Sequence, residues 1–496
     1  MLIKNGQAFD TEAIEYMGYS AFYAAVVERL GRPECHCLAY FADRAAGGVL
    51  RLYAVLADDG SRSLDLLAAE AREVETLMSM TAERPAMHAF ERGIHEAYGV
   101  AFAGHPWLKP LRYAHDRKAG GDIYDYPFFD IQSEEFHRVG VGPIHAGIIE
   151  PGHFRFICEG EKIHHLEIQL GWQHRGVENL MVAKGKTLQR ATIAESIAGD
   201  TVVGHGTAFA LMYEALAGVE VDPLIAYDRT VALEHERIAV HTGDLSAICT
   251  DIAYQLGNAV FGRLRTPMIN FFQKWCGSRF AKGLIRPGYT NFPFTGALAD
   301  EWLKTAEAFE PDFREMAAQM FDLPSVLSRI ERTGAVSTDL ASRLGLEGMA
   351  AKASGVARDV RWSHPCLLYG EMGLEPVTLK SGDVYARARV RYEEVLQSLG
   401  NIRSLVGRRP EADGRERRRV EALVGGRMCV SLVEGWRGVC VHVGRTDGDG
   451  NLDLYRVVDP SVHNWMGLAM AVRGNGISDF PICNKSFDLS YCGHDL

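Results

Sequence analysis

The feature that most constrains the fold of this chain is a series of long apolar runs that starts at Thr187. In these runs, apolar residues return at the three- and four-residue spacing of an α-helix. The runs cover Thr187 to Gly218, Thr230 to Arg265, Pro267 to Leu284 and Asp300 to Thr333, the last broken near Pro311 and Pro324. Helices of this length predict a bundle, and a bundle can hold a site between its facing helices.

The first 115 residues have a different pattern, which predicts a small α/β module. A glycine pair, Gly47-Gly48, separates two strand-like runs and is typical of a hairpin. The expected elements are a helix from Glu12 to Leu30, strands at Cys37–Ala42 and Val49–Ala57, and a helix from Leu64 to Met80.

Smaller β pieces are expected on both sides of the bundle, so the predicted fold class is α+β. Residues 116–140 look like a linker with charges and a Gly120-Gly121 pair. Further expected elements are strands around Phe154–Cys158 and Leu166–Leu170, a helix from Gly382 to about Leu399 capped by Asp383, strands at Gly438–Gly444 and Leu452–Val458 around an Asp-Gly turn, and a final helix from Ser461 to Val472.

Composition excludes several classes of protein. The chain carries 53 Lys and Arg against 64 Asp and Glu, a formal net charge of −11, which argues against a nucleic-acid protein. The ten cysteines form no C-x-x-C pair and read as reduced thiols of a cytosolic protein. No signal peptide and no run of roughly 18 apolar residues is found, so any membrane contact is expected through partner subunits.

Histidines, glycines and carboxylates crowd into a few short segments between residues 140 and 215. These segments are Gly142–Gly147, Glu150–His153, Gly171–Glu178 and Glu195–His205. Such residues suit loops that closely approach a reactive centre. Taken singly, each Gly-Pro is a turn and each histidine is a satisfied core or surface group. The order of these segments along the chain is more informative, because it matches that of a known family.

The set resembles the large subunit of membrane-bound, energy-converting (group 4) nickel-iron hydrogenases, and is similar to the quinone-site 49-kDa subunit of respiratory complex I. Gly142 to Phe156 looks like the opening of the hydrogenase domain, and His174 to Glu178 like its HRGxE signature. The resemblance continues to the C-terminus, with a close match at Ala353–Arg361. It implies a hydrogenase-large-subunit-like domain over residues 141–496, after the linker at 116–140.

The segment Glu91–Val100 resembles the signature of the complex I 30-kDa-type subunit, which implies a fused 30-kDa-like module over residues 1–115. The alternative is an acidic helix followed by a turn.

Active hydrogenases hold nickel and iron with two C-x-x-C pairs, since thiolates suit these soft metals. The stretch that matches the first pair places Ala198 and Thr201 at the ligand positions. The stretch Ser486–Asp495, which matches the second pair, places Ser490 and Gly493 there. We therefore expect a site whose frame is kept and whose nickel chemistry is lost. We expect no cofactor on this chain, and no nicotinamide site, because a G-x-G-x-x-G loop after a strand is absent.

The resemblance implies an electron-transfer subunit of a complex-I-like, hydrogenase-related oxidoreductase of the NADH-quinone oxidoreductase or formate hydrogenlyase type. Its partners would be an iron-sulfur small subunit and membrane subunits, and it would lie peripherally on the cytoplasmic side of the inner membrane. Two alternatives stay open: a quinone-reducing subunit with His145 near the headgroup, and a non-catalytic scaffold subunit.

The candidate site residues are polar groups of the matching segments. They are His145, His153, His174, Asp200, His205 and Asp488. We expect their loops to converge on one cavity beside the surface that docks an iron-sulfur subunit, where they carry protons or bind an acceptor. A separate basic run, Arg408–Arg419, is either a solvated face or a docking patch for an acidic partner.

Overall fold

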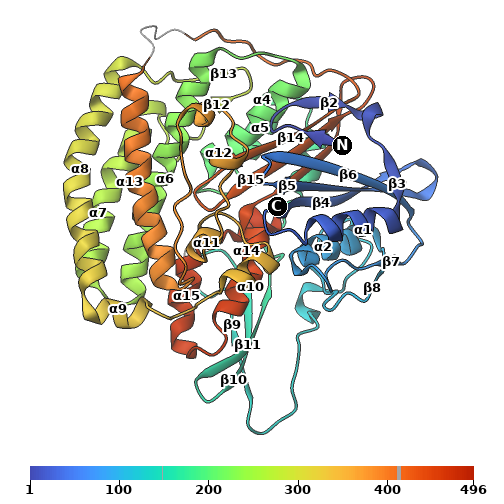
Figure 1. Ribbon diagram of the computed structural model, residues 1–496, viewed down its shortest axis with the longest axis horizontal. Coiled ribbons are helices and arrows are strands. Elements are labelled where there is room, and N and C mark those ends of the chain that lie inside the picture. Colours follow the sequence, from blue (N-terminus) through green and yellow to red (C-terminus); the bar gives the residue numbers. More distant parts are fainter. Residues whose placement is uncertain (148, 410–414) are drawn as a thin grey trace.

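The computed structural model describes residues 1–147, 149–409 and 415–496. Helices and strands are mixed, and helical residues clearly outnumber strand residues, as expected for an α+β chain. Figure 1 shows the long helices on one side of the molecule and the larger sheets on the other. No described helix is both long and apolar enough to cross a membrane.

The N-terminal sheet has the order β1-β6-β5-β4, with β3 added in parallel to β6. Its strands are β1 (Leu2–Ile3), β3 (Tyr16–Gly18), β4 (Cys35–Ala45), β5 (Val49–Asp58) and β6 (Ser63–Arg72). The expected β4–β5 hairpin is confirmed, with a turn at Ala46–Gly48. Helices α1 (Tyr19–Arg29) and α2 (His88–Tyr98) pack against this sheet.

Two expected helices of this region are wrong in whole or in part. The run Leu64 to Met80 forms β6 and the short β7 (Leu77–Met78), which pairs with β8 (Phe102–Ala103). Residues 66–69 of β6 are all buried, so side chains on both faces of the strand are covered and its apolar residues lose strict alternation. A short, continuous apolar run of this kind cannot be told from a helix by periodicity alone. Upstream, helix α1 starts only at Tyr19, after a 3₁₀ turn (Thr11–Ala13) and β3.

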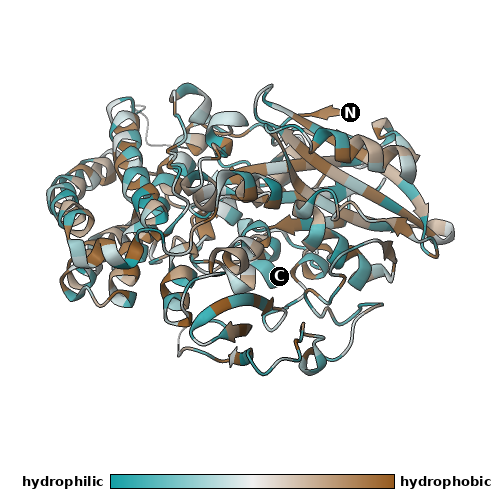
Figure 2. Ribbon diagram, turned by 60° about the horizontal axis from the view of Figure 1, so that its bottom comes forward, coloured by the Kyte–Doolittle hydropathy of each residue, from teal (hydrophilic) through white to brown (hydrophobic). Residues whose placement is uncertain are grey.

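A second sheet joins the two ends of the chain. Its order is β16-β15-β14-β2, from β2 (Ala8–Asp10), β14 (Arg427–Glu434), β15 (Val439–Thr446) and β16 (Leu452–Val458). The Asp-Gly turn between β15 and β16 is confirmed, whereas β14 was not expected. Buried residues of both sheets form one hydrophobic cluster, so the core is continuous across residue 115. The strands of this region are the most hydrophobic ribbons in Figure 2.

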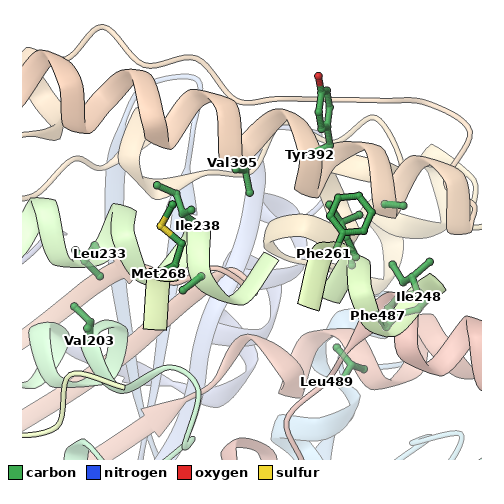
Figure 3. Packing of buried hydrophobic residues seen from close by; sticks show 14 of the residues in the cluster. Val203, Leu233, Ile238, Ile248, Phe261, Met268, Tyr392, Val395, Phe487 and Leu489 are labelled. Atoms are coloured by element: carbon green, nitrogen blue, oxygen red, sulfur yellow. The ribbon is translucent and has the colours of Figure 1, made fainter. Parts of the chain in front are cut away.

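The four long helices are α6 (Pro223–Asp251), α7 (Gln255–Cys276), α8 (Gly296–Asp322) and α13 (Val384–Gly407). Figure 3 shows their buried side chains, among them Ile238, Met268 and Val395. The expected run from Thr230 to Arg265 is two helices, because the chain turns back at Ile252–Tyr254. Pro267 and Pro311 lie inside α7 and α8 without ending them. Asp383 caps α13 as predicted, accepting from the Ala386 N–H at 2.9 Å.

Shorter elements connect and cover the bundle. A three-stranded sheet consists of β9 (His137–Val141), β10 (His153–Glu159) and β11 (Lys162–Gln169), which confirms the two strands expected here and places β9 within the predicted linker. The remaining pieces are α3 (Val177–Ala183), α4 (Thr187–Ala194), α5 (Val202–Ala217), β12 (Ile285–Arg286), β13 (Tyr289–Thr290), α9 (Pro324–Ile330), α10 (Thr338–Leu344), α11 (Gly348–Ala353) and α12 (Val360–Ser363).

The C-terminal segment folds back into the middle of the molecule (Figure 1). Helix α14 (Pro460–Ala471) is the expected one, but it is not final, since α15 (Phe480–Phe487) and α16 (Tyr491–Asp495) follow. In the basic run, residues 410–414 lie outside the described residues. Arg415 lies buried, 2.8 Å from Asp228, so this arginine is not part of a solvated face.

Candidate functional site

The two stretches that match the metal-binding motifs lie at helix caps. Thr201 is the N-cap residue of α5, and Ala198 lies in the turn that follows α4. Ser490 is the N-cap of α16, and its Oγ accepts a hydrogen bond from the Gly493 N–H at 2.9 Å. Hydroxyl residues are favoured at N-caps because they satisfy the free N–H groups of the first turn. The Ser490 hydroxyl therefore caps its helix, whereas the Thr201 hydroxyl makes no capping bond and donates to Asp200 Oδ1 at 3.2 Å.

Arg437 joins the two stretches. It lies in the turn between β14 and β15, and its guanidinium makes two 2.7 Å bonds to the Asp200 carboxylate. It also donates to Thr201 Oγ1 at 3.2 Å and to the Asp488 carbonyl, and it stacks on Trp436 at 3.9 Å. Burial lowers the pKa of Arg437, but Asp200 outweighs burial and raises it above its usual range. Arg437 thus connects the two motif stretches, through a bidentate ion pair to Asp200 and a hydrogen bond to the Asp488 carbonyl.

A second arginine, Arg175 of the HRGxE segment, does the same with neutral partners. Its guanidinium donates to the carbonyls of Ser196, Ile197 and Cys492 at 2.5–2.9 Å. The neighbouring His174 bonds the Asp495 carbonyl through Nδ1 at 2.8 Å. The third motif segment is therefore tied to both others.

Asp459, at the start of α14, fills the space beside Gly493. A Cβ added to Gly493 would lie 2.5 Å from the Asp459 Cγ, so no larger side chain fits there without movement. Asp459 Oδ2 lies 3.0 Å from His205 Nε2, and Oδ1 accepts from the Ser461 N–H at 2.8 Å. Burial raises the pKa of this carboxyl, but the hydrogen bond and charge of His205 bring it down to about 2. Asp459 is therefore an anion at neutral pH.

Hydrogen bonds continue from His205 toward the second sheet. His205 Nδ1 lies 3.0 Å from His442 Nε2, and His442 Nδ1 lies within bonding distance of the Tyr455 hydroxyl. All four side chains, from Asp459 to Tyr455, are fully buried. Burial lowers the pKa of His442 and raises that of Tyr455. Chains of this type can shift protons between their members, because each imidazole is both donor and acceptor.

The loop at residues 142–153 meets the C-terminal segment at its edge. His145 Nε2 lies 3.3 Å from the Tyr491 hydroxyl, and Glu150 accepts from the Cys492 N–H at 3.1 Å. Burial lowers the pKa of His145. Ile144 and Ile149 of this loop are exposed. This edge combines a histidine-tyrosine pair with apolar side chains at the surface.

Two carboxyls near the motif stretches, the partly buried Asp488 and the buried Glu236, have raised pKa values. Burial, together with the nearby Asp244, raises the pKa of Asp488 to about 6, although Lys485 at 3.2 Å opposes this. Burial raises the pKa of Glu236 to about 8, despite N–H bonds from Val203 and Gly204 at 2.8 and 3.2 Å. Both groups can therefore gain or lose a proton within the physiological range.

Five of the six predicted site residues contact the C-terminal segment directly or through a bridging group. They are His145, His174, Asp200, His205 and Asp488. His153 lies apart, on β10 against Phe128. Of the six, only His174 lines the 350 Å³ cavity described below. Sequence reasoning missed Arg437, Arg175, Asp459, His442 and Tyr455, of which only Arg175 carried a signal, as part of the HRGxE segment.

The residues present do not fit a nickel-iron centre. A methyl group, two hydroxyls and a glycine occupy the four positions that match the metal ligands. The nearby thiols of Cys440 and Cys492 are buried, and burial raises their pKa, to about 12 for Cys492, so they stay protonated. Within the described part of the chain, no group of three or more His, Cys, Asp or Glu side chains is placed to hold a metal ion.

Known proteins match this chain along most of its length. Residues 257–423 match the family described as the 49 Kd subunit of respiratory-chain NADH dehydrogenase. Hydrogenase-4 component G of Escherichia coli is 25% identical over 478 residues, 90% of this chain and 81% of that protein. Formate hydrogenlyase subunit 5 of Escherichia coli is 26% identical, covering 83% and 76%. The C/D subunit of NADH-quinone oxidoreductase from Phocaeicola vulgatus is 27% identical, covering 70% and 73%.

Proposed function

Because the chain carries a domain of the 49-kDa-subunit family and its relatives are hydrogenase large subunits and C/D subunits of NADH-quinone oxidoreductase, we propose that it is an electron-transfer subunit of a complex-I-like, hydrogenase-related oxidoreductase. In this assembly an iron-sulfur partner delivers electrons. The chain itself holds no nickel-iron centre.

The observation that carries this proposal is the Arg437 contact between the two motif stretches. A cation with two bonds to Asp200 and one to the Asp488 carbonyl takes over the crosslink between stretches that a metal provides in active hydrogenases. The frame is thus maintained by protein groups alone. A frame without metal ligands supports a role in moving charge or binding an acceptor, and not in hydrogen activation.

Protons are the natural counterpart of the electrons. An electron that arrives in a low-dielectric interior leaves uncompensated negative charge, which costs several kcal/mol unless a proton follows. His145, His174, Asp200, His205 and Asp488 are the candidate proton carriers or acceptor-binding groups, with His153 further out on β10. The chain Asp459–His205–His442–Tyr455 supplies a buried path between the motif stretches and the second sheet.

The finer organisation follows from the same resemblance. Residues 1–115 correspond to a 30-kDa-like module, 116–140 to a linker and 141–496 to the 49-kDa-like domain. Partners are an iron-sulfur small subunit and membrane subunits, and the chain lies peripherally at the cytoplasmic face of the inner membrane.

A second candidate function is quinone reduction, which the loop at residues 142–153 favours. A histidine-tyrosine pair can donate hydrogen bonds to a quinone headgroup, and exposed Ile144 and Ile149 offer apolar contact to its tail. A scaffold role is favoured by the pairing of these charges, because the half-exposed Asp200 and the buried Asp459 both have partners within the protein. Retained charges that are fully paired do not by themselves require catalysis.

Two substitutions in the purified, assembled complex separate these roles. His145→Ala and Asp200→Asn should each lower electron flux to a quinone analogue or an artificial acceptor by roughly a hundredfold, the lower end of what a proton-transferring group contributes. His137→Ala, on exposed β9, is the matched control and should leave the flux unchanged. Full flux in both test variants within an intact complex would favour the scaffold role. Loss in His145→Ala with quinone only would favour quinone reduction.

A further inference from the structure

A cavity of about 350 Å³ lies where the N-terminal sheet meets the 49-kDa-like part of the chain. Its walls are β4, α2, the segment 111–118, the start of α3 and the end of β16, and Figure 1 places the C-terminus beside β4 and α2. Its size is that of a small-molecule site. Apart from His174, its residues are not among the candidate proton carriers or acceptor-binding groups named above.

One side of this cleft is apolar. Phe41, Phe90, Ile94, Leu111 and Val462 line it, and all five are buried. Apolar walls of this kind favour a ligand with an apolar body, since each Å² of apolar surface removed from water contributes about 25 cal/mol.

The acidic side chains of the cleft are largely occupied by the protein itself. Both oxygens of Glu96 accept backbone N–H bonds, from Arg112 at 2.8 Å and from Tyr113 at 2.7 Å. Glu178 accepts from the Val457 N–H at 2.9 Å and lies 3.8 Å from Arg456. Asp116, which is exposed, accepts from Asn179 at 3.3 Å. Negative charge here serves mainly to hold the walls in place.

Two of the cationic side chains, Arg112 and Lys118, have no ion-pair partner among the described residues. Arg112 donates its Nε to the His494 carbonyl at 2.7 Å, and its two terminal nitrogens take part in none of the described ion pairs. Lys118 is exposed at the rim and is likewise outside the ion pairs found among the described residues. His174 donates its Nδ1–H to the Asp495 carbonyl, so its Nε2 can donate to a carboxylate when the ring is an imidazolium, with both nitrogens protonated. A guanidinium with a free edge is suited to bind a carboxylate with two hydrogen bonds.

We infer that this cleft is a binding site for a small organic anion, a carboxylate with an apolar body. The carboxylate lies between Arg112, Lys118 and His174, and the apolar body lies against α2 and Phe41. Arg112 and His174 also bond the carbonyls of His494 and Asp495. The ligand is therefore linked, through these two side chains, to the C-terminal segment that contains Ser490 and Gly493. The inference does not depend on the proposed redox function.

Isothermal titration of the purified protein tests this site with four probes: phenylacetate, hexanoate, acetate and inorganic phosphate. We expect phenylacetate or hexanoate to bind at one site, with acetate and phosphate about tenfold weaker because they lack the apolar body. The neutral analogue phenylacetamide should also bind about tenfold weaker, because it loses the charge-assisted bonds.

Variants locate the binding. Arg112→Gln and Lys118→Gln should each weaken phenylacetate binding by about tenfold, whereas Arg117→Gln should not, since Arg117 bonds only carbonyls of its own segment. The Lys118 side chain makes no described hydrogen bond, so its variant reports on binding even if Arg112→Gln disturbs folding. The inference is overturned if neither apolar carboxylate binds, if phosphate binds as tightly as they do, or if the three variants bind alike.

Discussion

The motif stretches and the cleft beside α2 are both rich in charge, yet they use it in opposite ways. At the motif stretches, Arg437 and Asp200 neutralise each other, and Asp459 is paired with His205. At the cleft, the acids are held by backbone and side-chain groups of the protein, whereas the cations Arg112 and Lys118 line the cavity without an ion pair among the described residues. The first region resembles a protein core in its packing and pairing, and the second resembles a receptor. Resemblance to a metalloenzyme family therefore does not by itself indicate where this chain binds small molecules.

The largest expected effect comes from removing Arg437. Arg437→Met leaves Asp200 without its partner and frees the Asp488 carbonyl, which should lower the free energy of unfolding by about 3 kcal/mol. The value is below the upper end for buried pairs, because the Asp200 side chain is 37% exposed. Urea denaturation measures the change. Arg418→Met, at an exposed pair with Glu416, is the control and should leave the free energy of unfolding nearly unchanged.

Two glycines, one in each motif stretch, test how tightly the neighbouring side chains are packed. Gly493→Ala should destabilise the protein by about 1–3 kcal/mol, because its Cβ would lie 2.5 Å from the Asp459 Cγ. Gly199→Ala, in the other motif stretch, meets no atom within 4 Å and should change stability by less than about 0.5 kcal/mol. Equal effects in thermal or urea unfolding would contradict a closed position at Gly493.

Stability should depend on pH through Glu236. Its pKa rises from 4.5 in the unfolded chain to about 8 in the folded one, chiefly through burial. Between these values the folded state holds a proton that the unfolded state has released, so the free energy of unfolding falls as pH increases from about 4.5 to about 8. The loss is on the order of a few kcal/mol. In Glu236→Gln this part of the decline should disappear, and an unchanged pH profile would refute the assignment. Glu220→Gln, at an exposed position, is the control.

The smallest effect is expected at the cleft. Arg112→Gln loses one hydrogen bond, to the His494 carbonyl, and should lower the free energy of unfolding by about 1 kcal/mol while it weakens anion binding by about tenfold. A loss as large as that of Arg437→Met would show that the cleft is a structural element, and the contrast between the two regions would fail.

Local patterns predicted much of this structure and distant contacts accounted for the errors. The bundle helices and the β4–β5 hairpin follow from apolar spacing and Gly47-Gly48. Strand β6 was misread because elements packed on both sides of the sheet bury its central residues, which the run Leu64–Met80 does not reveal.

The same holds for the site. The motif stretches were identified from their order in the chain, but Arg437, Asp459 and His442 reach them from sequence positions far from residues 195–205. Their role depends on how the second sheet and α14 pack, and a single sequence holds no local signal for that.

The central claim is that this chain keeps the frame of a hydrogenase-type site and holds it together with protein groups in place of metal. Elemental analysis of the purified, intact complex tests it most directly, with nickel counted per copy of this chain. The account predicts nickel far below one atom per chain, with iron present only in proportion to the clusters of the iron-sulfur partner. About one nickel atom per chain, retained through extensive dialysis, would contradict it.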